Sequence, residues 1–295
     1  MPQYPISPEI YDQSIPQIAT AKTVILDFLK ETHIHGDETI IDACCGTGNL
    51  AGFLGSYLPN CTIIGLDNAV NMIEFAKEKY FQNNVSFLLE DLTSFNESRK
   101  KSADFMICSW AVSHIPMEQQ KNFTNNLYQY LKKEGQLIIL FPIMGSTLSS
   151  VIQEVIKSEK WSKIFTKLEN NRVTFTVEQY DELLRQVGFI DRKVRLCSEE
   201  ITFKDQSELR CFIITSLARY LPYIPDPELC EEFINDVTDN YREKIPNLSY
   251  TVTILSAIAK RPFLNLLLQN AGAFTHNSNS SQEKDITQSL CSQPN

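Results

Sequence analysis

The chain has 295 residues, of which 43% are hydrophobic and 21% charged, and this composition excludes a disordered or low-complexity protein. Its 36 acidic residues outnumber 27 basic ones and give a net charge of −9, so we expect no nucleic acid among its main ligands, because such ligands need clustered positive charge. No apolar stretch reaches the roughly 18 residues that a membrane span needs, and the first residues lack the basic and apolar segments of a secretory signal.

Short apolar segments alternate with amphipathic ones between residues 18 and 135, which is typical of a parallel sheet covered by helices on both faces. The expected helices are Ile18–Lys30, one that follows Gly48, Ala69–Lys79 and Met117–Leu131. The expected strands are Thr39–Ala43, Thr62–Leu66, Val85–Leu89, Asp104–Ser109 and Gln136–Phe141. The pattern therefore predicts an α/β fold with a doubly wound sheet.

The second half of the chain has a different pattern of expected helices and strands. We expect a helix over residues 147–165, a second that begins with a capping box at Thr176 and ends near Gly188, and two more that begin after Asp205 and Asp226. Strands are expected over residues 190–203 and 248–260. Residues 271–295 are rich in Ser, Asn and Gln, so we predict that they form a flexible tail.

A glycine turn follows the first expected strand. The strand runs through Asp42 into Gly46 and Gly48, which open a helix. Glycines allow close approach of backbone to a ligand, and N–H groups at a helix start favour an anionic group. About 20 residues further on, the second strand ends in Asp67, whose carboxylate lies beside the glycine turn in a doubly wound sheet and can accept both hydroxyls of a ribose. The sequence therefore predicts a nucleoside ligand.

Two later strands end in register with this turn. The third is followed by Asp91, which can accept from the exocyclic amine of adenine, and the fourth by Trp110 and His114. Together these residues resemble the class I S-adenosylmethionine-dependent methyltransferases. The resemblance covers roughly residues 11–140, and Leu131–Gly135 matches the turn before the fifth strand of that family. It implies a seven-stranded, mostly parallel, Rossmann-like sheet and S-adenosyl-L-methionine as the cofactor.

The family resemblance also assigns the cofactor contacts. It implies that the loop from Asp42 to Gly48 holds the methionine part and that Asp67 holds the ribose. The residues expected around the rest of the cofactor are Asp91 and Leu92 at the adenine amine, Asn68 and Met72 flanking the adenine, Ser109 after the fourth strand, and Tyr11 closing over the whole. The family usually has Gly where this chain has Cys44, so we expect a slightly displaced loop.

Two other interpretations of these residues stay open. Asp42 and Asp67 alternatively cap helices, as a lone Asp at a strand end often does. Binding of a dinucleotide is the second, and it fits less well because the glycine pattern stops at Gly48 and lacks the spacing that holds a pyrophosphate.

The segments around the core resemble a narrower group. Residues 11–17, 109–115 and 221–233 are similar to trans-aconitate and juvenile hormone acid methyltransferases, which esterify carboxylates. The resemblance implies a small-molecule carboxylic acid as substrate. Such an acid has a pKa of about 4 and is ionised at neutral pH, so the reaction needs orientation and exclusion of water but no base. Our candidates for the catalytic contacts are Gln17, Trp110 and His114, whose side chains can act as neutral donors.

Several alternatives concern the acceptor site. His114 is either a substrate contact or a satisfied histidine at a helix start. A phenol or another hydroxyl as acceptor would use His114 as the base, and a protein that binds the cofactor without catalysis is a further possibility. The aromatic residues considered for an apolar acceptor pocket or for helix packing are Trp161, Phe165, Phe175, Phe212 and Tyr220, and the possible anchors for a distal acid group are Arg172 and Arg219.

The domain organisation follows from these assignments. We expect one methyltransferase domain over residues 1–270, with a cofactor-binding core at 18–142 and a helical cap formed by residues 147–172 and 205–245. The eight cysteines are scattered and lack metal-ligand spacing, so we predict reduced thiols, no metal and a cytoplasmic protein.

Overall fold

The seven strands of the protein form one sheet in a computed structural model that describes residues 5–32, 34–143, 145–168 and 173–263. The strands lie in the order β3-β2-β1-β4-β5-β7-β6, and β7 runs antiparallel to both of its neighbours. Their bounds are β1 Thr39–Ala43, β2 Thr62–Asp67, β3 Val85–Leu89, β4 Ala103–Ser109, β5 Leu131–Pro142, β6 Ile190–Thr202 and β7 Ser249–Lys260. This is the predicted doubly wound, mostly parallel seven-stranded sheet.

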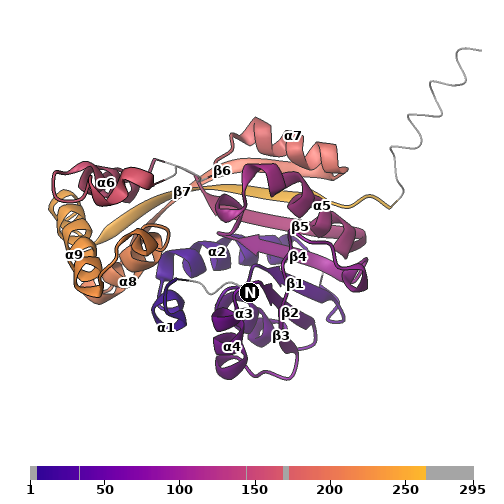
Figure 1. Cartoon of the computed structure of the whole chain (residues 1–295). Coiled ribbons are helices and arrows are strands. Elements are labelled where there is room, and N and C mark those ends of the chain that lie inside the picture. Colours follow the sequence, from indigo (N-terminus) through magenta and orange to yellow (C-terminus); the bar gives the residue numbers. More distant parts are fainter. Residues whose placement is uncertain (1–4, 33, 144, 169–172, 264–295) are drawn as a thin grey trace, which may run out of the picture.

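Helices cover both faces of the sheet (Figure 1). One face carries α2 (Ile15–Glu31), α3 (Asn49–Tyr57) and α4 (Val70–Lys79), and the other carries α5 (Gln120–Tyr130) and α7 (Val177–Val187). Neighbouring residues of β1 point to opposite sides, so Ile40 packs in the first core and Ile41 in the second. A strand buried on both faces reads as a continuous apolar run, which explains the composition of β1.

A second group of helices lies at one end of the molecule, at the left of Figure 1. These are α6 (Thr147–Lys157), α8 (Gln206–Ser216) and α9 (Pro227–Lys244), which we call the cap helices. The cap helices lie beside the part of β6 and β7 that extends past β5. The pairing of β5 with β7 ends at Pro142 and Ile254, whereas β6 stays paired with β7 as far as Ser249. Trp161, Phe165 and Phe233 form an aromatic cluster among them, with ring centroids 5.0 Å apart for Trp161–Phe233 and Phe165–Phe233.

The remaining short helices are placed between these elements. They are α1 (Pro8–Asp12) and the 3₁₀ turns η1 (Glu97–Arg99), η2 (Val112–His114), η3 (Met117–Gln119), η4 (Ile164–Lys167) and η5 (Leu221–Tyr223). In the described part of the chain, every helix is too short or too polar to cross a membrane.

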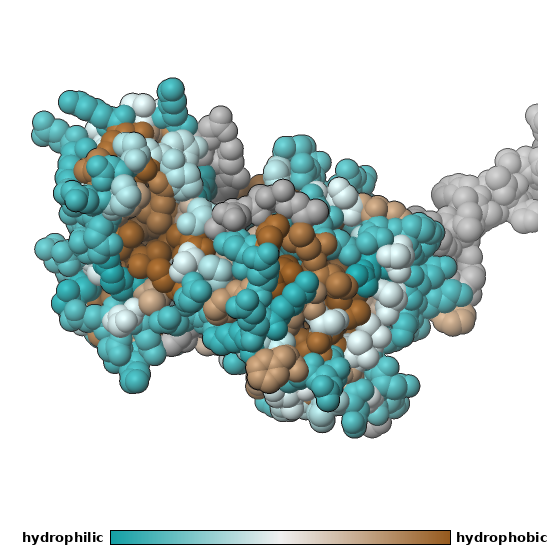
Figure 2. All heavy atoms as spheres, turned by 60° about the horizontal axis from the view of Figure 1, so that its bottom comes forward, coloured by the Kyte–Doolittle hydropathy of each residue, from teal (hydrophilic) through white to brown (hydrophobic). Residues whose placement is uncertain are grey.

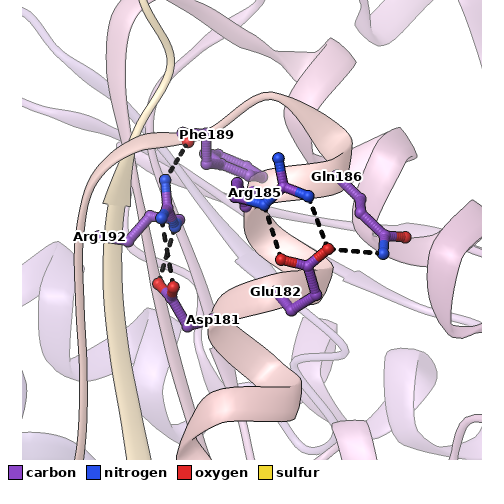
Figure 3. Close-up of polar contacts among 6 residues, drawn as sticks. All are labelled: Asp181, Glu182, Arg185, Gln186, Phe189 and Arg192. Carbon is purple, nitrogen blue, oxygen red and sulfur yellow. Dashed lines mark hydrogen bonds and ion pairs between the residues drawn. The ribbon is translucent and has the colours of Figure 1, made fainter.

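The helix α7 is capped at both ends and paired with the neighbouring strand. Its first turn has the predicted capping box, because Thr176 Oγ1 accepts from the N–H of Gln179 while the Gln179 side chain accepts from the N–H of Thr176. The helix ends at Gly188, whose φ of 108° is left-handed. On β6, Arg192 donates to both carboxylate oxygens of Asp181 and to the carbonyl of Phe189 (Figure 3). These contacts hold the edge strand against its covering helix.

Some predicted elements have different bounds. The helix expected over residues 147–165 ends at Lys157, because Ser158 takes an extended conformation and the 3₁₀ turn η4 follows. The helix expected from Met117 begins as the 3₁₀ turn η3 and becomes α-helical at Gln120. The strand expected from Gln136 begins at Leu131, with a register shift against β4. The predicted flexible tail, residues 271–295, lies outside the described residues.

Candidate functional site

The loop after β1 turns through left-handed conformations. Cys44, Gly46 and Gly48 have φ angles of 60°, 52° and 78°. The position where the family usually has Gly is therefore one that favours Gly, and Cys44 adopts the same left-handed conformation. A Cβ on Gly48 would lie 2.5 Å from the ring of Phe87. Gly48 is thus required for close packing of α3 on the sheet.

Asp67 joins the end of β2 to this loop. Its Oδ2 accepts from the N–H of Gly46 and its Oδ1 from the N–H of Ala69, both at 2.9 Å. The bond to Ala69 is a local turn contact of the kind expected for a capping residue, but the bond to Gly46 crosses from β2 to the loop after β1. The carboxylate thus fixes the loop and still has lone pairs for a ligand.

Asp42 lies below the loop and is 2% exposed. Burial, together with the nearby Asp67 carboxylate, raises the pKa of Asp42 to about 7, against an opposing hydrogen bond from the N–H of Ala51. Burial also raises the pKa of Asp67. Among the described residues, Asp42 Oδ2 has no hydrogen-bond partner. A buried acceptor of this kind calls for a donor from a ligand.

A cavity of about 550 Å³ opens at the carboxyl ends of β1, β2 and β4 and continues under the cap helices. Ligands of open α/β sheets bind at this edge. Figure 2 shows hydrophobic atoms at the surface in the left-hand part of the molecule, where the cap helices lie, bordered by hydrophilic ones. The predicted site residues that line the cavity are Tyr11, Gln17, Gly46, Asp67, Asn68, Met72, Asp91, Leu92, Ser109, Trp110 and His114.

Two predicted residues lie elsewhere. Asp42 lines an adjoining cavity of about 50 Å³, which shares Tyr11, Gln17, Ser109 and Trp110 with the large one. Gly48 lines neither cavity and stands behind the loop. Gly48 therefore shapes the path of the backbone in the loop and does not line the space for a ligand.

The residues expected at the adenine differ in exposure. Met72 and Leu92 are buried, at 2% and 4% exposed, and offer apolar walls. Asp91 is exposed, and its Oδ1 accepts from the backbone N–H and the hydroxyl of Thr93 at 2.9 and 2.7 Å. These two bonds to Oδ1 fix the orientation of the carboxylate and therefore the position of its other oxygen, Oδ2.

Tyr11 covers the glycine loop from α1. A Cβ on Gly46 would lie 3.2 Å from the Tyr11 ring. The short helix is anchored by Asp12, which is 8% exposed, pairs with Lys79 and accepts from Tyr80 OH at 3.2 Å. The N-terminal segment is therefore held over the loop by the buried carboxylate of Asp12, which pairs with the exposed Lys79.

Trp110 differs from its expected role. Its indole N–H donates to Thr20 Oγ1 on α2 at 3.0 Å and is thus engaged within the protein. Its φ of 62° is left-handed, and its backbone N–H donates to the carbonyl of Leu140 at 2.6 Å. Strained backbone of this kind gathers at functional sites. Trp110 lines the cavity with its ring while its donor points to α2.

The cap side of the cavity contains some of the expected aromatic residues. Phe212 and Tyr220 line it, whereas Trp161, Phe165 and Phe175 pack in the core. Arg219 lines it as well and lies over the ring of Tyr220, at 5.4 Å from the centroid. Arg172 lies outside the described residues.

Sequence reasoning missed three contributions to the site. Thr20 holds Trp110, and Ser14 shares a hydrogen bond of 3.1 Å with Thr215 on α8, which joins the N-terminal segment to the cap. Ser113 lines the cavity and is 2% exposed. Ser14 and Ser113 lie in segments that the resemblance covers, residues 11–17 and 109–115, and this was the available signal for them.

The donor and acceptor groups fit the cofactor that the resemblance implies. Asp42 Oδ2 and Gln17 Oε1 are buried acceptors without a partner among the described residues, and an α-ammonium group would supply their donors. The apolar Met72 and Leu92 suit an adenine ring. Within the described residues, no group of three or more His, Cys, Asp or Glu side chains could hold a metal ion.

Comparison with known proteins agrees with this geometry. Residues 40–135 match the family described as a methyltransferase domain. The "Putative methyltransferase 235L" of Invertebrate iridescent virus 6 is 27% identical over 237 residues, which cover 80% of this chain and 86% of that protein. Juvenile hormone acid O-methyltransferase of Drosophila melanogaster is 24% identical over 213 residues, covering 69% of this chain and 71% of that protein.

A solved structure has the same fold. Phosphoethanolamine N-methyltransferase 2 of Haemonchus contortus, solved with S-adenosylhomocysteine, superimposes with a TM-score of 0.51 at 19% identity over 81% of this chain. The matched part covers 53% of that chain, so this protein spans about half of its length. The matching domain, the relatives and the sheet topology identify the chain as a class I S-adenosylmethionine-dependent methyltransferase.

Proposed function

We propose that the protein esterifies a small-molecule carboxylic acid. The observation that carries this proposal is the distribution of charge around the cavity. Its acidic lining residues are Asp67, the last residue of β2, and Glu90 and Asp91, which follow β3, on the side expected to hold the adenosyl group. The lining residues after β4 and in the cap include no Asp or Glu in the described part, and they include Arg219. An anionic acceptor suits that side.

The chemistry of a carboxylate suits these side chains. Bound S-adenosylmethionine supplies an electrophilic methyl group, whose C–S bond breaks as the acceptor oxygen bonds to the carbon, which leaves S-adenosylhomocysteine and a methyl ester. A carboxylate is ionised at neutral pH, so the protein has no proton to remove. Its task is to orient one oxygen and to exclude water, and orientation alone can contribute much of the acceleration.

Residues of the chain divide into two groups in this proposal. The first group holds the cofactor, and in it Asp67 accepts from the ribose. The adenine is surrounded by Asn68, Met72, Asp91 and Leu92. The methionine part is held under Tyr11 by Asp42, Gly46 and Ser109. His114 is an acceptor contact, and Gln17, which lines both cavities, is shared between the acceptor and the methionine part, because its amide both donates and accepts. Because its N–H is engaged by Thr20, Trp110 contributes a rigid wall that fixes the acceptor, and not a hydrogen bond.

The half-buried thiol of Cys44 does not compete for the methyl group. Cys44 lines the cavity, but a hydrogen bond with Cys108, together with burial, raises the pKa of Cys44 well above its ordinary value. The thiol therefore stays protonated at neutral pH, and the thiolate is the nucleophilic form.

The relative from Drosophila melanogaster, a juvenile hormone acid O-methyltransferase by name, adds support for an acid as substrate.

A hydroxyl acceptor is the second candidate, because His114 lines the cavity and could act as its base. The two candidates differ in pH dependence. With the cofactor at saturating concentration, carboxylate methylation stays flat above about pH 5.5, whereas hydroxyl methylation rises through a pKa near 6.5.

A panel of acids tests the proposal. Short di- and tricarboxylic acids, fatty acids and terpenoid acids are each incubated with S-adenosylmethionine, and release of S-adenosylhomocysteine and formation of a methyl ester are measured. The same panel with matched phenols and alcohols is the control. Ester formation with an acid supports the proposal, and methylation confined to hydroxyl compounds would contradict it.

We also propose a cytoplasmic location and the domain division given above. The seven cysteines in the described part all carry free thiols, as expected in a reducing compartment. Packing of α6 and α8 against α9 supports one cap over residues 147–172 and 205–245, of which residues 169–172 lie outside the described part.

A further inference from the structure

Ser113 has a buried hydroxyl group that the residues around it leave unsatisfied. It lies in the 3₁₀ turn η2 after β4, lines the large cavity and is 2% exposed. Its Oγ has no hydrogen-bond partner among the residues that the structure describes. The large majority of buried side-chain polar atoms are hydrogen-bonded, so a hydroxyl of this kind beside a cavity points to a ligand atom.

The turn that carries Ser113 is held rigidly on both sides. Gln120, which is itself 2% exposed, donates from Nε2 to the carbonyls of Val112 and Ile115, both at 2.8 Å. The carbonyl of Ser113 accepts from the N–H of Val173 at 3.4 Å. These bonds fix the backbone on each side of Ser113, so its hydroxyl is positioned before a ligand binds.

The sheet order assigns this hydroxyl to the acceptor and not to the cofactor. In the order β3-β2-β1-β4, the expected ribose and adenine contacts follow β2 and β3, on the opposite side of β1 from β4. The small cavity at Asp42, Gln17 and Ser109, where the methionine part is expected, does not include Ser113. Ser113 thus lines the large cavity on the β4 side, which the expected cofactor contacts leave to the acceptor.

We propose that Ser113 donates a hydrogen bond to the carboxylate of the acceptor. This inference rests on the proposed function and adds a residue to it. A neutral donor holds one carboxylate oxygen and leaves the charge on the other, so the attacking oxygen stays nucleophilic. An ester oxygen is a weaker acceptor than a carboxylate, because bonds to ionised groups are about twice as strong. The same bond therefore loosens when the product forms, which favours release.

The test compares Ser113→Ala and Ser113→Cys, the second of which keeps the shape of the side chain, with a somewhat larger sulfur atom, but donates weakly. The control is Ser256→Ala, since Ser256 is 1% exposed in β7 and does not line the cavity. The probes are the best methylated acid of the panel and its primary amide. Binding of each is measured in the presence of S-adenosylhomocysteine, with kcat, KM and cofactor affinity measured beside it.

Both Ser113 variants should lower kcat/KM for the acid by at least about tenfold and weaken its binding, with cofactor affinity unchanged. Binding of the neutral amide should change less than threefold, which a merely structural role would not produce. The inference is overturned if Ser113→Cys retains full kcat/KM, or if acid and amide weaken equally. If the wild-type enzyme methylates no acid, the proposed function fails and this inference with it, so the two failures are distinguishable.

Discussion

The indole N–H of Trp110 donates to the hydroxyl of Thr20 at 3.0 Å, and this bond joins the end of β4 to helix α2 across 90 residues of sequence. Thr20 is fully buried and its hydroxyl in turn donates to the carbonyl of Pro16 at 2.8 Å. The hydrogen bond from the indole to Thr20 thus helps to hold Trp110 in its left-handed backbone conformation. The wall of the acceptor region depends on a residue that makes no contact with the cavity.

Replacing Thr20 with Val should disturb turnover while leaving cofactor binding unchanged. Val keeps the shape but removes the acceptor for Trp110, so we expect a loss of about 1–2 kcal/mol in the free energy of unfolding and a fall in kcat. Denaturant unfolding and steady-state kinetics measure both. Thr238→Val on α9 is the matched control, because Thr238 makes the same bond within its helix without a tryptophan partner. Equal effects on kcat from the two variants would contradict the role of Thr20.

Replacing Asp67 with Ala should remove most of the cofactor affinity. The carboxylate is expected to accept from two ribose hydroxyls, and two bonds to a charged acceptor correspond to roughly a hundredfold or more in Kd. The variant also loses the bond to the N–H of Gly46, which fixes the glycine loop. Calorimetric titration with S-adenosylhomocysteine measures the affinity.

Asp104→Ala is the control for Asp67. Asp104 lies at the opposite end of the sheet, where it accepts from Thr39 and Lys132. This variant should lower stability and keep its affinity for the cofactor. An Asp67→Ala protein that binds as tightly as the wild type would refute the assignment of the ribose site.

The sequence predicts most of the sheet edge but not its side-chain contacts. Strands β1 and β3 have the predicted bounds because each is a short apolar run between polar or turn residues. The contact of Asp67 with Gly46 follows from the pairing of β1 with β2. In contrast, the bond of Trp110 to Thr20 and the unsatisfied hydroxyl of Ser113 depend on rotamers and packing between distant segments, which no local pattern encodes.

Cofactor affinity should weaken as the pH falls through about 7. The pKa of Asp42 is raised to about 7, so its carboxylate becomes protonated below that pH and no longer attracts the α-ammonium group expected beside it. Affinity for S-adenosylhomocysteine should therefore be higher above about pH 7 than below it. Titrations from pH 5.5 to 9 test this, and the acid side of the profile should flatten in Asp42→Asn.

The same carboxylate should make the free protein less stable as the pH rises. The folded pKa of Asp42 lies above its ordinary value of 3.8, so the folded state binds the proton more tightly than the unfolded state. Its contribution to stability is fully present below pH 3.8 and is lost as the pH rises to about 7. Urea unfolding without cofactor at pH 5.5 and 8.5 should show this loss, and Asp42→Asn should reduce it. A wild-type protein equally stable at both values would argue against a neutral Asp42.

Replacing Arg219 with Met should affect acids that carry a second anionic group more than simple ones. Arg219 lines the cap side of the cavity, where its stacking on Tyr220 orients the guanidinium. A distal carboxylate paired with it would lose a charge-assisted contact, so we expect KM for a dicarboxylic acid to rise about tenfold and KM for the monocarboxylic acid of equal length to change little. Arg242→Met on α9 removes a similar charge from a residue outside the cavity and serves as the control. Equal changes in KM for both acids would contradict an ion pair between Arg219 and the second carboxylate. Arg219 would then only shape the cavity, and the acceptor would be recognised through its apolar part.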